Sequence, residues 1–135
     1  MENSYINHLA VFVCAVLSLV IGGLWYSPLL FFKSWQAASG LTDEQLKQAN
    51  PIKNYSLAFL LAYVISYNLA FFLGDKATNW QWGLTAGLLA GAGWAATMFI
   101  IIGLFELRSL KYLLINSGYI VVYFALIGFI LGLWR

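Results

Sequence analysis

Charge is what this 135-residue chain has least of, with 7 Lys or Arg, 5 Asp or Glu, and 9% charged residues overall. A soluble domain usually carries about 25% charged residues, so this chain has too few to cover a surface in water. Four segments contain none at all: Asn3–Phe32, Asn54–Gly74, Ala77–Phe105 and Tyr112–Trp134. Each reaches the roughly 20 apolar residues that span a bilayer as a helix. The scarcity of charge therefore excludes a soluble protein and predicts an integral membrane protein.

The apolar runs are continuous and lack strand-like alternation, which favours helices over a β-barrel. We expect an all-α polytopic membrane protein, with four transmembrane helices in an antiparallel bundle that forms one domain over residues 1–135. The expected spans are about 6–26, 55–73, 82–105 and 112–134. The second and third loops are short, so helices that follow one another in the sequence should be neighbours in space.

Other absences exclude further classes. A single cysteine, Cys14, excludes an internal disulfide framework. The start, MENSYINH, has no Lys or Arg before the apolar run and no small-x-small site follows it, so we expect no cleaved signal peptide. His8 stands alone, and no cluster has metal-ligand spacing.

The sequence also lacks a phosphate loop, a nucleophile with a base, and a carboxylate pair. We therefore expect no enzyme, no cofactor and no metal. A net charge of +2 does not suggest a nucleic-acid partner. No acid or base lies in the middle of a span, which argues against an ion-coupled pump.

Residues 28–50 form the long loop, and we expect short helices in it. Pro28 suits the first turn of a new helix. Aromatic residues around Lys33 make an amphipathic piece suited to the membrane interface, with Gly40 as its stop.

The rest of this loop reads as a small polar helix in water. Thr42 and Gln45 have the spacing of a capping box. Asn50-Pro51 is expected to end this helix.

Three motifs carry a family resemblance that covers nearly the whole chain. They are GxLWYSPLLF at Gly23–Phe32 with Trp35 after it, the LTDEQLKQANP insertion, and INSGY at Ile115–Tyr119 followed by an IGFILGLW end. The chain resembles the bacterial "domain of unknown function 1761" family, although Phe32 stands where a Gly is expected. The resemblance implies a small four-helix membrane protein without assigned activity, and it supplies no catalytic residues.

The stretch GGLWYSP at residues 22–28 ends the first span at one side of the membrane, here called side B. Trp25 and Tyr26 suit an anchor at headgroup level. The alternative is that they form the floor of a binding pocket. Gly22 and Gly23 would let a neighbouring helix approach closely.

Small residues recur at four-residue spacing in the third span, at Gly83, Gly87, Gly91 and Ala95. Helices in lipid associate through close backbone contact, so this face is predicted to pack against another helix. The alternative is that thin walls make room for a ligand or a pore. Trp94 is expected to project from the middle of this face.

Hydroxyl groups from all four spans are predicted at one level, roughly 10–14 Å from side B at 1.5 Å per residue. They are Ser18, Tyr63, Thr97 and Tyr119. A second polar level nearer the opposite side, side A, comprises His8, Asn68 and Thr85. These levels indicate either hydrogen bonds between helices or a polar path for a small solute.

Charges crowd the third loop, with Glu106, Arg108 and Lys111 at side B. They are either solvated interfacial charges, or Glu106 pairs with a nearby cation and closes side B. Side B holds five Lys or Arg and side A holds two, so the positive-inside rule predicts a cytoplasmic side B with both termini outside.

Three functions remain open. The first is a structural or accessory membrane protein that acts through helix packing and association, as a homo-oligomer or with a partner membrane protein. The second is an oligomeric channel or transporter for a small neutral solute, and the third is a lipid-binding protein at the cytoplasmic interface. In each case the lipid bilayer is the surrounding partner, and a bacterial plasma or inner membrane is the expected location.

Two sets of candidate residues follow from these patterns. The candidate binding residues are Trp25, Tyr26, Tyr63, Trp94, Thr97, Glu106, Arg108 and Tyr119. The candidate packing residues are Gly22, Gly23, Gly83, Gly87 and Gly91.

Overall fold

The computed structural model describes residues 6–135, and every regular element in that range is helical. The first five residues of the expected N-terminal segment, and with them part of the signal-peptide prediction, lie outside the described range. Four stretches are long and apolar enough to cross a membrane, in agreement with the charge-free segments. They are α1 (His8–Trp25), α4 (Pro51–Phe72), the α5–η1–α6 stretch (Trp80–Phe105) and α7 (Leu110–Leu133).

Each span begins at a side chain that accepts a hydrogen bond from the backbone N–H groups of the first turn. These caps are Asn7, Asn50, Asn79 and Ser109. At α4 the cap moves the helix start from the expected residue 55 back to Pro51, a residue that fits the first helical position. Asn50-Pro51 therefore starts α4, whereas we predicted that it ends the polar helix.

Two short helices connect α1 to α4: α2 (Phe32–Ser39) and α3 (Asp43–Lys47). The predicted capping box is confirmed, because the Thr42 hydroxyl accepts from the Gln45 N–H and the Gln45 side chain accepts from the Thr42 N–H. Gly40 ends α2 at a φ of 75°, which a glycine adopts without strain. Pro28 lies in the turn before α2, so it does not occupy the first turn of that helix.

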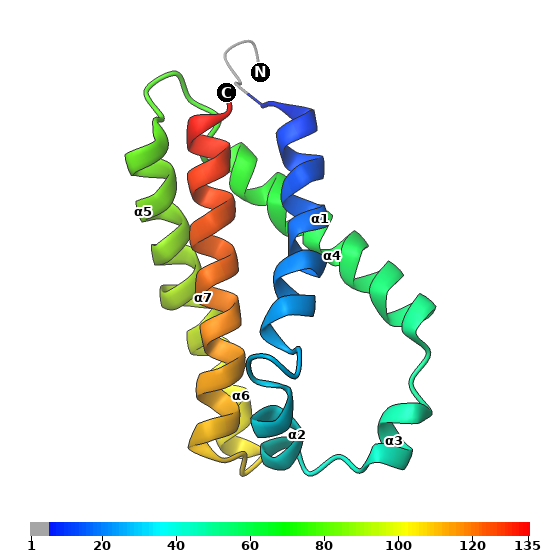
Figure 1. Ribbon diagram of the computed structural model, residues 1–135. Coiled ribbons are helices and arrows are strands. Elements are labelled where there is room, and N and C mark those ends of the chain that lie inside the picture. The colour runs from blue at the N-terminus through cyan, green and yellow to red at the C-terminus, as the bar shows by residue number, and fades with distance from the viewer. Residues whose placement is uncertain (1–5) are drawn as a thin grey trace.

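The α5 helix (Trp80–Ala90) and α7 make the most extensive helix contact in the described chain and lie side by side (Figure 1). A Cβ atom added at Gly83 or Gly87 would overlap a backbone carbonyl oxygen of α7, at Gly128 and Phe124 respectively. In the other direction, a Cβ atom at Gly128 would lie 3.0 Å from the Gly87 Cα. The two backbones touch because both helices carry glycine at the contact.

A π-helical turn, η1 (Gly91–Ala95), joins α5 to α6 (Ala96–Phe105) and changes which residues face α7. The face runs through Gly91 and continues at Ala96, which is 4% exposed, instead of the predicted Ala95. The wider turn adds one residue to the step between contacts. It also moves Trp94 off the small-residue face, so the prediction for that side chain is wrong, and its indole is 73% exposed.

A second contact region joins α1, α4 and α7 around buried residues such as Val11, Cys14, Leu69 and Ile127. Most of the α4 residues in it come from the C-terminal half of the helix, with Phe59 the contribution from the N-terminal half. The helix crosses behind α1 and leans away from the rest of the molecule toward its own N-terminus (Figure 1). The spans α4 and α5, which we expected to pack together, barely touch and leave a groove between them.

Candidate functional site

The end of α1 packs against the start of α7, so that GGLWYSP (residues 22–28) contacts INSGY (residues 115–119). We call this contact region the corner. The Trp25 indole N–H donates to the Ile115 carbonyl oxygen at 2.9 Å. The ring lies directly over Gly118, where an added Cβ atom would be 2.7 Å from an indole carbon. Trp25 is therefore held in a slot that only glycine at position 118 leaves open.

Tyr26 makes the second contact of this corner. Its hydroxyl donates to the side-chain oxygen of Asn116 at 2.5 Å, and its ring lies 5.7 Å from the ring of Tyr119 and 5.8 Å from that of Trp35. Burial raises the pKa of the Tyr26 hydroxyl above its ordinary value, with Tyr119 and Tyr112 adding to the shift. The hydroxyl therefore keeps its proton and remains a hydrogen-bond donor.

The amphipathic α2 contacts Tyr26 through Trp35 and also packs against α7. Beside its contact through Trp35, the Arg108 guanidinium donates to the Ser39 carbonyl oxygen at 3.2 Å and lies 4.8 Å from the centre of the Tyr112 ring. Glu106 is exposed at the end of α6. Arg108 thus contacts α2 and α7, and among the described residues it forms no ion pair with Glu106, the alternative that we considered.

Tyrosines of α7 hold the centre of the molecule together. The Tyr119 hydroxyl donates to the Ser18 carbonyl oxygen at 2.8 Å. The Tyr123 hydroxyl donates to the Cys14 carbonyl oxygen at 2.9 Å and lies 3.3 Å from the Ser66 hydroxyl oxygen of α4. These contacts join α7 to α1 and α4, which is what interhelical hydrogen bonding predicts.

The other members of the predicted hydroxyl level are not brought to Tyr119. Tyr63 stacks on Tyr67, with ring centres 5.3 Å apart, and it also contacts aromatic residues of α1 and α4. Thr97 is exposed and bonds to carbonyl oxygens of its own helix. The four hydroxyl residues therefore do not line one path.

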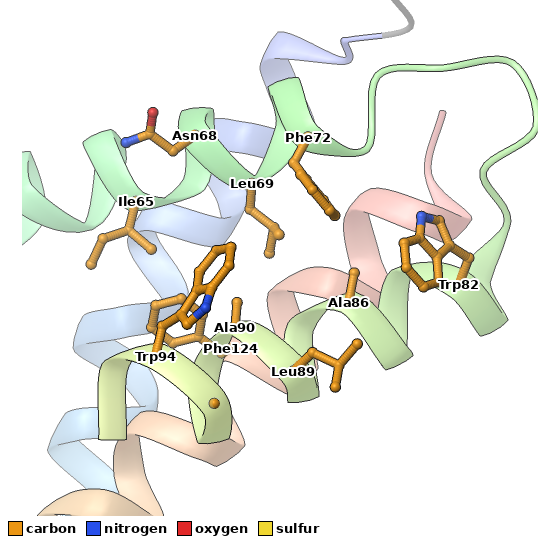
Figure 2. Close-up of a pocket in the computed structure, with 11 residues that line it drawn as sticks. Ile65, Asn68, Leu69, Phe72, Trp82, Ala86, Leu89, Ala90, Trp94 and Phe124 are labelled. Atoms are coloured by element: carbon orange, nitrogen blue, oxygen red, sulfur yellow. The ribbon is translucent and has the colours of Figure 1, made fainter. Parts of the chain in front are cut away.

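The second polar level is also divided. The His8 Nδ1 atom lies 2.7 Å from the Tyr67 hydroxyl oxygen of α4. The Thr85 hydroxyl instead donates a hydrogen bond to the Gln81 carbonyl oxygen in its own helix. Asn68 of α4 is among the residues that line the α4–α5 groove, and its amide group points away from α5 (Figure 2).

The groove between α4 and α5 has a volume of about 580 Å³. The ring centres of Phe72 in α4 and Trp82 in α5 lie 6.3 Å apart, near the loop that joins the two helices. Trp94 points into the groove from η1 (Figure 2). The walls are otherwise mostly aliphatic or aromatic, with Phe124 of α7 among them. The π-helical turn thus removes Trp94 from the packing face and adds it to this groove.

The packing glycines fall into two groups. Gly83, Gly87 and Gly91 lie in the α5–α7 contact. A Cβ atom added at Gly22 would lie at an ordinary contact distance, 3.5 Å, from the Tyr119 hydroxyl oxygen, and one added at Gly23 would meet open space.

The sequence reasoning missed residues on the partner side of each contact. Gly128 and Gly132 of α7 are four residues apart and match the glycine spacing of α5, so this signal was present in the sequence. Tyr123 and Ser66 gave no such signal, because a single hydroxyl inside an apolar run does not say which helix it faces.

The corner brings together two of the motifs that carry the family resemblance. Comparison with protein families identifies the same family. The family described as "Protein of unknown function (DUF1761)" matches residues 9–132, which includes all four spans. No curated protein and no solved structure gives a significant match. The chain therefore belongs to the DUF1761 family.

Proposed function

We propose that this protein is a structural or accessory membrane protein that acts by association, and that α4 is the helix that binds its partner. It needs no catalytic residue and no cofactor for this role. The observation that carries the proposal is the first half of α4, residues 51–61, in which every side chain but the half-buried Phe59 is exposed.

The apolar character of that segment supports a membrane partner. Ile52 is 80% exposed and Leu61 is 64% exposed, and Tyr55, Leu57 and Leu60 are exposed beside them. Tilt in a membrane helix is set by packing against its neighbours. A span that leans away from its own chain is therefore suited to pack against another one.

The corner at side B supports the proposal as well, because it involves spans other than α4. It links α1, α2 and α7 to one another through Trp25, Tyr26 and Arg108. The first half of α4 takes no part in this corner, so its outer face remains available to a partner.

A photo-reactive amino acid placed at position 57 of α4 or position 114 of α7 tests this in native membranes. Leu57 and Leu114 are 49% and 58% exposed and lie near the same side of the membrane. We expect protein adducts at position 57, identified by mass spectrometry, and only lipid adducts at position 114. Equal protein adducts at both positions, or none at position 57, would contradict the proposal.

The proposed orientation places side B in the cytoplasm and both termini outside, because Lys and Arg are concentrated on side B. Single cysteines in a Cys14→Ala background test it with an impermeant thiol reagent. Position 47 in α3 should stay unlabelled in intact cells, and position 76 in the α4–α5 loop should be labelled. The reverse pattern would overturn this orientation.

Lipid binding is the second candidate function, and the α4–α5 groove favours it. Its apolar walls and volume of about 580 Å³ suit an acyl chain entering from the bilayer. Ala90→Phe should fill the groove and remove a lipid that native mass spectrometry detects on the wild-type protein. Ile102→Phe, at an exposed position of α6 outside the groove, is the control, and retention of the same lipid by both variants would exclude groove binding.

Solute permeation has less support than either. Tyr63, Thr97 and Tyr119 contact different neighbours, so the hydroxyl level that motivated a polar path is not assembled within one chain.

A further inference from the structure

The outward face of α4 carries a repeat that the packing of α4 on α1 leaves uncovered. Its residues are separated by three and four positions in turn, as are the residues along the contact between two helices of a coiled coil. We call this set of residues the seam. They are Asn54, Leu57, Leu61, Val64, Asn68 and Phe71, and all six are exposed. The opposite face of α4 packs on α1 through Ala62, Ser66 and Leu69.

The seam has two polar members, Asn54 in the first turn of α4 and Asn68 deeper in the span. Asn68 is the one that bears on association. It precedes Phe72, the last residue of α4, by four positions, or about 6 Å along the helix axis. Its amide points out of the fold (Figure 2) and has no hydrogen-bond partner among residues 6–135. An unpaired amide is costly in an apolar environment, and a second helix can satisfy it.

We infer that two copies of this chain associate through α4, with Asn68 of each copy facing Asn68 of the other across a two-fold axis. This inference rests on the proposed function and names the partner as a second copy. Both copies enter the membrane in the same orientation, so their α4 helices run parallel and the two-fold axis is normal to the membrane. An amide carries both a donor and an acceptor, so two identical amides can bond to each other.

The seam itself argues for a dimer. Asn54, Leu61 and Asn68 recur every seven residues and occupy one heptad position. Asparagine at that position specifies register and oligomer state in two-stranded coiled coils. Leu57, Val64 and Phe71 fill the alternating position with apolar side chains, which suit the knobs-into-holes contacts of a coiled coil.

Lipid is the competing partner for Asn68, because the ester region of the bilayer lies near this end of α4. A lipid contact would satisfy the amide but would contribute nothing to association. The two cases therefore differ in the dimer fraction of an Asn68 variant.

Single cysteines in a Cys14→Ala background locate the interface. Leu61→Cys lies on the seam, and Met98→Cys is a control of similar exposure on α6, since the native residues are 64% and 56% exposed. Oxidation in native membranes should give a disulfide-linked dimer at position 61 and none at position 98.

Asn68 variants then test the amide in liposomes, with the dimer fraction followed by single-molecule photobleaching over a range of dilutions. Asn68→Leu should weaken the dimer roughly three- to tenfold, the range expected for one interhelical hydrogen bond. Asn68→Gln should restore most of the affinity, and Thr85→Leu, a control at the same side of the membrane, should leave it unchanged.

The outcomes separate the two proposals. Equal or absent disulfide formation at positions 61 and 98, or an unchanged dimer in Asn68→Leu, overturns the α4 seam. If position 57 nevertheless yields adducts with a different membrane protein, the proposed function stands and only this inference fails. If position 57 yields no protein adduct and the chain is monomeric in native membranes, both fail.

Discussion

The α5–α7 pair and α4 are all apolar enough to span a membrane, but the pair and the N-terminal half of α4 behave in opposite ways. In the pair, glycine faces glycine and the backbones touch, as at Gly83 against Gly128. In α4 the corresponding outward face carries Leu57, Leu61 and Val64, each about half exposed or more. Apolar character puts a helix in the membrane, but small residues decide how closely the backbone of another helix can approach it.

The largest expected effect comes from breaking the tighter of these two regions. Gly87→Leu places a side chain against the Phe124 backbone, so α5 and α7 must separate. We expect the free energy of unfolding to fall by about 3 kcal/mol, the upper part of the range for overpacking. Denaturant unfolding in one lipid or detergent system, followed by circular dichroism, measures this change.

Gly23→Leu is the matched control, because an added side chain at position 23 meets open space. It should change stability by no more than about 0.5 kcal/mol. Equal losses in the two variants would show that glycine packing does not hold α5 to α7.

A smaller effect is expected within α4, where one of two adjacent residues is packed against α1 and the other is exposed. Ala62 faces α1 and is 4% exposed, whereas Leu61 faces outward. At dilutions that keep the protein monomeric, Ala62→Leu should cost about 2 kcal/mol by overpacking, and Leu61→Ala should cost less than about 0.5 kcal/mol. A large loss for Leu61→Ala in the monomer would mean that the outer face of α4 is packed after all.

The smallest effect concerns the corner, where hydrogen bonds and aromatic contacts replace glycine packing. Tyr26→Phe removes the donor to Asn116 and leaves the ring in place. We expect a loss of about 1 kcal/mol, within the range for hydrogen bonds between membrane helices. Tyr55→Phe, at an exposed position of α4, serves as the control for hydroxyl removal.

A double-mutant cycle with Asn116→Ala isolates the pair. The coupling energy should account for most of the Tyr26→Phe loss. If the two losses simply add, the hydroxyl and the amide act independently and the contact does not hold α1 to α7.

Much of the architecture could be predicted because local chemistry is enough to specify it. Runs without charge locate the spans, since the bilayer accepts few charged side chains and requires every backbone hydrogen bond to be made within a helix. The Thr42 capping box and the stop at Gly40 depend on neighbouring residues alone. The expected small-residue face at Gly83, Gly87 and Gly91 needed only helical periodicity.

The sequence by itself thus determined the solvent, the helices and which residues are small enough for close packing. The tertiary structure decided which helix meets that face, where α4 goes, and which side chains form the corner at Trp25 and Tyr26. It also decided the π-helical turn, which shifts the face to Ala96 and turns Trp94 into the groove. These features depend on the fit between surfaces far apart in the chain, and in lipid any apolar face is accepted until another helix packs against it closely.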